Sequence, residues 1–129
     1  MSLIVIFTIK AIHWFGDFVL QTDEQAKNKS KDNSFLLAHV SSYSITWLFI
    51  MPTVFLFSGL SIIGVHKSVL LFLSITFVTH FITDYFTSRL NSKLLAKGDV
   101  HNFFVSVGFD QVLHYVQLFL TYKLCLYIF

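Results

Sequence analysis

The sequence predicts an all-α protein integral to a membrane, with one domain of four antiparallel helices packed as a bundle over residues 1–129. Two observations carry this prediction. Of the residues, 55% are hydrophobic and only 12% are charged, and the apolar residues gather in four long stretches. Soluble domains carry about 25% charged residues, so the composition excludes an ordinary soluble fold. Such an apolar composition also excludes a disordered chain.

The four apolar stretches cover about residues 3–20, 35–60, 68–88 and 103–129. Each is close to the roughly 20 residues that a helix needs to cross a bilayer core of about 30 Å, and none alternates like a strand. The first stretch lacks the basic leader and small-residue cleavage site of a signal peptide, and it contains Lys10 and Asp17. We therefore expect it to remain in the mature protein as the first span.

The connections at 21–34 and 89–102 are polar, whereas the one at 61–67 is short and holds a single basic residue, Lys67. The polar connections contain Lys27, Lys29, Lys31, Arg89, Lys93 and Lys97. By the positive-inside rule, both polar connections face the cytoplasm and both termini face outward, with the bacterial inner membrane as the expected location.

The net charge of +2 is too small to bind nucleic acid. The bilayer is the expected partner, and homo-oligomerisation stays open.

Ionisable residues inside the apolar stretches are the most informative feature of the chain. Inserting a charged side chain at the centre of a membrane helix costs roughly 2.5–3.5 kcal/mol, so such residues usually pair with another polar group or form a functional site. Three stretches carry a His and an Asp spaced by four residues, which places both side chains on one helix face. With one further histidine, the set is His13, Asp17, His39, His80, Asp84, Asp110 and His114.

Counting along the helices at 1.5 Å per residue places all seven side chains in one slab, roughly 6–17 Å from the cytoplasmic boundary. Imidazole nitrogens and carboxylate oxygens suit Zn²⁺, Fe²⁺ or Mn²⁺, and helical bundles build dinuclear sites from facing helices. The sequence therefore predicts one or two divalent transition-metal ions held by all seven residues, with zinc as the first choice. For any single pair, the alternative is a hydrogen bond between its own His and Asp.

Further polar residues extend the same helix faces. Asp84 and Lys10 are the candidates for a catalytic role, and Lys10 would act as a counter-charge or proton relay beside His13. The alternative for Lys10 is that it snorkels to the outer surface. Contacts to the ligands or to a substrate are predicted for Gln21, Lys27, Lys29, Ser88, Arg89 and Gln111.

Three blocks of sequence carry a family resemblance: HWFGDFVLQT from His13, HFITDY from His80 and DQVLH from Asp110. Together with His39, they resemble the domain-of-unknown-function family numbered 3307, which comprises small bacterial and phage integral membrane proteins. The resemblance implies a multi-span membrane protein and no particular activity. The helix-borne pairs are also distantly similar to those of LexA-regulated inner-membrane metal-dependent hydrolases. A His-x-x-x-Asp-aromatic motif recurs in the first and third stretches, which favours two hairpins as a weak internal repeat.

The function predicted from these residues is hydrolysis of a phosphoester on a small molecule or a lipid headgroup. A bound dication lowers the pKa of a coordinated water toward neutrality, and Lys27, Lys29 or Arg89 would attract the phosphate. Two other hypotheses stay open. One is an ion transporter or proton-relay module in which Lys10 joins the His/Asp groups in a path. The other is a non-enzymatic membrane adaptor locked by a structural metal.

Overall fold

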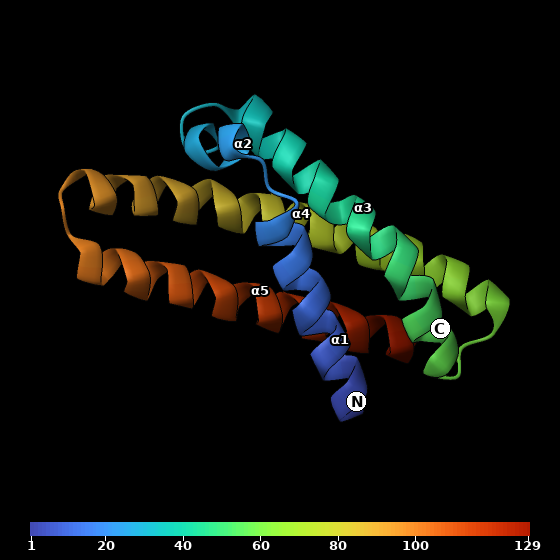
Figure 1. The fold of residues 1–129 in the computed structure, drawn as a ribbon. Helices are drawn as coiled ribbons and strands as arrows, with labels where there is room; N and C mark the ends of the chain where they lie inside the picture. Colours follow the sequence, from blue (N-terminus) through green and yellow to red (C-terminus); the bar gives the residue numbers. More distant parts are fainter.

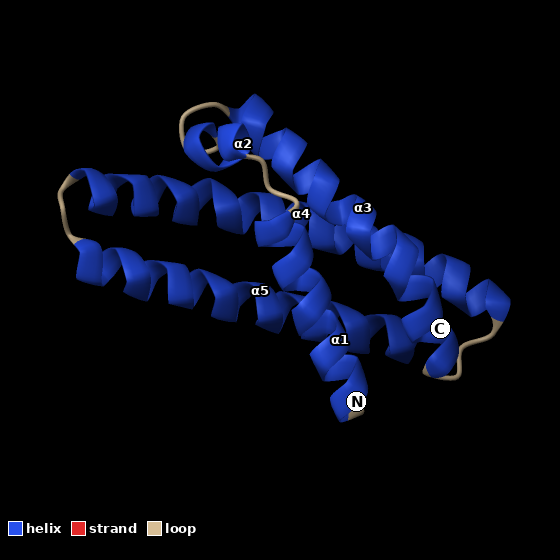
Figure 2. Cartoon of the chain, viewed as in Figure 1, coloured by secondary structure: helices blue, strands red, loops and turns tan.

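The computed structural model describes all 129 residues as helices joined by short connections, with no strand (Figure 2). The helices are α1 (Leu3–Trp14), α2 (Asp23–Asn28), α3 (Asn33–Phe57), α4 (Ile62–Ala96) and α5 (Val100–Ile128). One π-helical turn, Phe15–Val19, continues α1. The predicted all-α class is confirmed.

Three helices, α3, α4 and α5, are long and apolar enough to cross a membrane. Many large apolar side chains on them are exposed, including Phe49, Leu70 and Phe109, as expected for surfaces that contact lipid. The first predicted span, residues 3–20, is not among these three helices. There α1 has 12 residues and the π turn Phe15–Val19 continues it, so a membrane span at this segment stays a prediction.

The predicted four-helix bundle needs correction, because α2 is a fifth helix inside the first polar connection. A capping box explains its start. The Thr22 hydroxyl accepts a hydrogen bond from the Gln25 backbone N–H at 3.2 Å, and the Gln25 side chain accepts one from the Thr22 N–H at 3.0 Å. This Thr-x-x-Gln spacing satisfies two N–H groups that the first turn leaves free.

The other two connections are shorter than the sequence predicts. The hydroxyl of Ser61 caps α4 by accepting from the Gly64 N–H at 3.2 Å, so most of 61–67 is helical. At its far end α4 continues to Ala96, and Gly98 then turns the chain with a φ of 71°. Lys, Leu and Arg are strong helix formers, which is why this polar segment stays helical despite its composition.

Helix α4 packs against both α3 and α5, and α1 crosses these helices obliquely (Figure 1). The α2 region and the α4–α5 connection lie at one end of the molecule, while the α3–α4 connection and the C-terminus lie at the other (Figure 1). We call the first end the basic end, because it carries Lys27, Lys29, Lys31, Lys93 and Lys97.

The apolar core fills the half of the bundle away from the basic end. Its largest members are Trp47, Phe55, Phe72 and Tyr122, all buried. On α3, α4 and α5 alike, the predicted His and Asp residues lie between this core and the basic end.

Candidate functional site

All seven predicted ligand residues are buried and lie together where five chain segments meet. The segments are α1, the π turn, the start of α3 and the middle parts of α4 and α5. We call the group the His/Asp cluster. It consists of His13, Asp17, His39, His80, Asp84, Asp110 and His114.

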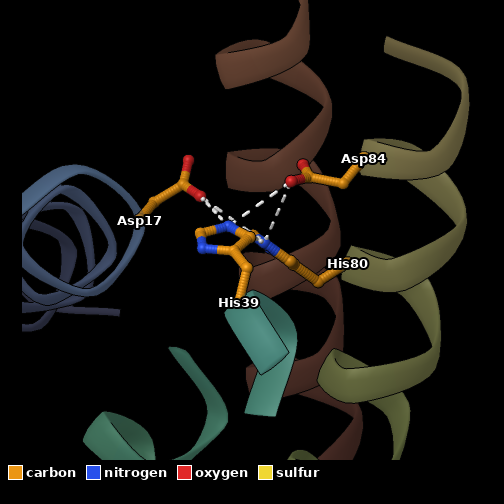
Figure 3. A group of neighbouring side chains, drawn as sticks. All are labelled: Asp17, His39, His80 and Asp84. Carbon is orange, nitrogen blue, oxygen red and sulfur yellow. Dashed lines mark hydrogen bonds and ion pairs between the residues drawn. The ribbon is translucent and has the colours of Figure 1, made fainter. Parts of the chain in front are cut away.

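Four members of the cluster converge on one point (Figure 3). The Nε2 atom of His39 lies 3.0 Å from Oδ1 of Asp17 and 3.4 Å from Oδ2 of Asp84. The Nε2 atom of His80 lies 3.5 Å and 3.7 Å from the same two oxygens. The two Nε2 atoms are 3.3 Å apart. Because all four potential ligand atoms lie within 4.8 Å of one another, they could hold one metal ion.

A second group of potential ligands adjoins the first and shares Asp17 with it. It comprises Asp17, Asp110 and His114, whose potential ligand atoms also lie within 4.8 Å of one another. The His114 Nε2 atom is 3.4 Å from Asp110 and 3.1 Å from Asp84, so it touches both groups. A carboxylate shared by two groups is the arrangement that a pair of metal ions uses as a bridge.

The hydrogen bonding of the cluster fits a metal ion. The Nε2 atoms of His39 and His80 lie 3.3 Å apart and both face carboxylate oxygens of Asp17 and Asp84, while Oδ1 of Asp110 is buried without a hydrogen-bond partner. Buried polar groups are normally satisfied, and several carboxylates buried together need compensating positive charge. A dication bound by imidazole and carboxylate groups supplies that charge, and this donor set suits zinc, iron or manganese.

His13 has a different environment from the other histidines. Its Nε2–H donates to the Gln111 side-chain oxygen at 2.9 Å, and its Nδ1 accepts from the Tyr43 hydroxyl at 2.9 Å. Both ring nitrogens are therefore in use, and His13 belongs to neither ligand group. The Gln111 amide in turn donates to Asp17 at 3.4 Å and Asp110 at 3.1 Å. Gln111 thus contacts two of the candidate ligand residues.

Tyr43 is a cluster contact absent from the predicted site. Besides its bond to His13, its ring stacks on the His80 imidazole with a centroid distance of 3.9 Å. The available signal is its position four residues after His39, which places both side chains on one face of α3.

The π turn brings Asp17 into the cluster by lying close to α3. A Cβ atom on Gly16 would lie 2.9 Å from Oγ1 of Thr46 and 3.0 Å from the Tyr43 ring. Only glycine permits this approach without displacement of the neighbours. Single π turns inserted in helices are frequent at functional sites.

Comparison with known protein families identifies one match. The family described as a protein of unknown function, DUF3307, matches residues 3–128. The chain belongs to this family. The match confirms the resemblance carried by the three sequence blocks, and it includes every residue of the cluster. No curated protein and no solved structure matches the chain.

Lys29 of this DUF3307 protein reaches the cluster from the α2–α3 connection. Its ammonium donates to Oδ2 of Asp84 at 2.7 Å. Burial opposes the charge of Lys29, but the carboxylates of Asp84 and Asp17 together outweigh that cost, so the pKa of Lys29 is raised. One cation therefore already neutralises part of the negative charge of the cluster.

The remaining predicted contacts of the DUF3307 protein lie further out. Lys27 is exposed, whereas Gln21 and Ser88 are half-buried with side-chain oxygens that have no hydrogen-bond partner. The Arg89 guanidinium donates to Oδ1 of Asn33 at 2.7 Å and does not form an ion pair with the cluster. Lys10 is exposed, and its Nζ lies 4.8 Å from the Tyr115 ring centroid, so it does not bond to the cluster either.

Proposed function

We propose that this DUF3307 protein is a membrane-integral protein whose His/Asp cluster binds one or two divalent transition-metal ions, with zinc preferred over iron or manganese. The observation that carries the proposal is the convergence of His39, His80, Asp17 and Asp84 on one buried point. Asp17 takes part in both ligand groups, which supports two ions bridged by one carboxylate. His13 would then orient the neighbouring groups through Gln111.

The membrane placement is part of the same proposal. Three long apolar helices with exposed outer surfaces support insertion. The basic end would face the cytoplasm and both termini would face outward, because the lysines of α2 and of the α4–α5 connection gather at one end (Figure 1).

We further propose that the site hydrolyses a phosphoester. A bound dication makes water a nucleophile at neutral pH. In the reaction a water oxygen bonds to phosphorus, the ester P–O bond breaks, and the proton of the water passes to the leaving alcohol. Lys29 and the nearby Lys27 would hold the negative phosphate oxygens beside Asp84, since these ammonium groups lie on the basic side of the cluster.

Two observations favour hydrolysis over transport. A relay through Lys10 would need this residue to bond to the cluster, but its side chain is exposed, and its Nζ lies over the Tyr115 ring with no hydrogen bond or ion pair to a cluster residue. Beyond the cluster, the path toward the other end is filled by the packed side chains of Trp47, Phe55 and Phe72.

Turnover measurements test the hydrolase proposal. We expect metal-loaded protein in detergent to hydrolyse phosphatidic acid or p-nitrophenyl phosphate, and an Asp84→Asn variant to lose at least about 100-fold in rate. Asp23→Asn, which makes the same change at an exposed position, should retain the rate. Metal-loaded protein without turnover would assign the ion a structural role instead.

A further inference from the structure

A polar groove adjoins the His/Asp cluster at the basic end. It lies between the α2–α3 connection and the α4–α5 hairpin and has a volume of about 660 Å³, within the usual range for small-ligand sites. Its polar lining includes Lys27, Lys29, Lys31, Ser88, Asn91 and Ser92.

The charge of the groove selects an anion. Three lysines line it and no acidic residue does. Two lining oxygens, Oγ of Ser88 and Oδ1 of Asn91, are buried without a hydrogen-bond partner. Buried polar groups of this kind are normally paired, so both are free to bond a ligand. The Ser88 hydroxyl can donate to a phosphate oxygen, and Oδ1 of Asn91 can accept from the P–OH group of a monoprotonated phosphate monoester.

One wall of the groove is apolar. It is formed by Leu95 on α4 and by Phe103 and Val107 on α5. Leu95 is 57% exposed, so this wall continues onto the outer surface of the hairpin. A wholly polar ligand would leave this surface uncovered, whereas an amphiphile covers it.

Lys29 connects the groove to the cluster, because it lines the groove and bonds to Asp84 at 2.7 Å. A phosphate held by Lys29 would therefore lie beside the candidate metal ligands.

We propose that this groove binds the phosphate headgroup of an anionic phospholipid, with an acyl chain along the wall of Leu95, Phe103 and Val107. Three features carry the proposal: the lysine lining, the two unpaired oxygens and the apolar wall. The claim that this lipid is the substrate rests on the proposed hydrolase function, whereas the claim that it binds does not.

Binding of phosphatidic acid to the chelator-treated protein in neutral detergent tests the site. We expect the variant Lys27→Gln/Lys31→Gln to bind roughly tenfold more weakly than the wild type. The matched control is Lys93→Gln/Lys97→Gln, which removes the same charge from the same end but outside the groove, and it should bind like the wild type. Phosphatidylcholine should bind weakly to all three proteins.

Two outcomes would overturn the inference. If both double variants lose the same affinity for phosphatidic acid, the lipid is attracted by the overall positive charge of the basic end and not by the groove. Inorganic phosphate that competes as strongly as phosphatidic acid would show a site for free phosphate, without a role for the apolar wall. The hydrolase proposal fails separately. Groove-dependent lipid binding without turnover refutes hydrolysis alone, and turnover of a soluble phosphoester without groove-dependent lipid binding refutes the lipid site alone.

Discussion

Lys29 and a metal ion would compete for one oxygen atom. Oδ2 of Asp84 accepts from Lys29 at 2.7 Å and also faces His39 at 3.4 Å and His80 at 3.7 Å. A dication bound among these groups would lie within a few ångströms of the ammonium. Like charges at about 4 Å repel by several kcal/mol even at an effective dielectric constant near 20. The lysine therefore lowers the affinity of the cluster for metal while it compensates the carboxylates.

Removal of the Lys29 charge should tighten metal binding. We expect Lys29→Gln to raise the affinity for zinc about tenfold, or about 1.4 kcal/mol. The measurement is a zinc titration in competition with a chromophoric chelator. Lys27→Gln, which alters an exposed neighbour that forms no ion pair, should have a much smaller effect. A weaker zinc affinity in Lys29→Gln would contradict competition for Asp84.

At the residue scale, the members of the cluster could be predicted from the sequence, but the long-range hydrogen bonds that join them to other residues could not. The spacing of His80 and Asp84 shows that two polar groups share a helix face, and that information is local. The bonds from Lys29 to Asp84 and from Gln111 to Asp17 join residues far apart in sequence. Such contacts depend on how the helices rotate and cross, which hydrophobic periodicity does not specify.

At the scale of elements, the π turn is the feature that most directly shapes the cluster. It places Asp17 within 3.0 Å of His39 on α3, and a Cβ atom on Gly16 would lie 2.9 Å from Oγ1 of Thr46 on the same helix. Added volume at a tight contact forces either the turn or α3 to move. The position of Asp17, the residue common to both ligand groups, therefore depends on a glycine.

A methyl group at Gly16 should disturb both stability and metal binding. We expect Gly16→Ala to destabilise the protein by about 1–3 kcal/mol and to weaken metal binding, because Thr46 and Tyr43 must shift. Thermal unfolding in detergent with and without metal measures both effects. Gly108→Ala is the control, since nothing lies within 4 Å of the added carbon, and it should be neutral or slightly stabilising. Equal stability of the two variants would contradict the packing argument.

Hydropathy predicted the helices well and their ends poorly. The predicted stretches 35–60, 68–88 and 103–129 correspond to α3, α4 and α5. The ends depend instead on capping residues such as Ser61 and on helix propensity in polar segments, which extends α4 to Ala96. The α-helical part of the first stretch ends early, at Trp14, because the π turn Phe15–Val19 follows it, and this turn does not change the hydropathy.

At the scale of the whole molecule, three zones follow one another along the bundle. An apolar core occupies one half, the His/Asp cluster lies next to it, and the basic end with its groove lies beyond. This order places the candidate metal site between the apolar core and a positively charged surface. The proposed membrane orientation would open the groove toward the cytoplasmic leaflet, where anionic headgroups occur.

Cysteine labelling in cells tests the orientation. In a Cys125→Ser background, we expect a membrane-impermeant maleimide to label Tyr127→Cys in intact cells, because the C-terminal end is proposed to lie outside. Lys97→Cys, in the α4–α5 connection, should react only after permeabilisation. Both side chains are exposed, so access depends on the side of the membrane. The reverse pattern would invert the topology.

The metal content of the purified protein tests the central claim most directly. Elemental analysis of detergent-purified wild type should find one or two equivalents of zinc, iron or manganese per chain. His80→Ala should lose most of this metal, whereas His66→Ala, which changes an exposed histidine on the same helix, should retain it. Wild-type protein without stoichiometric metal, or equal metal in wild type and His80→Ala, would contradict the account.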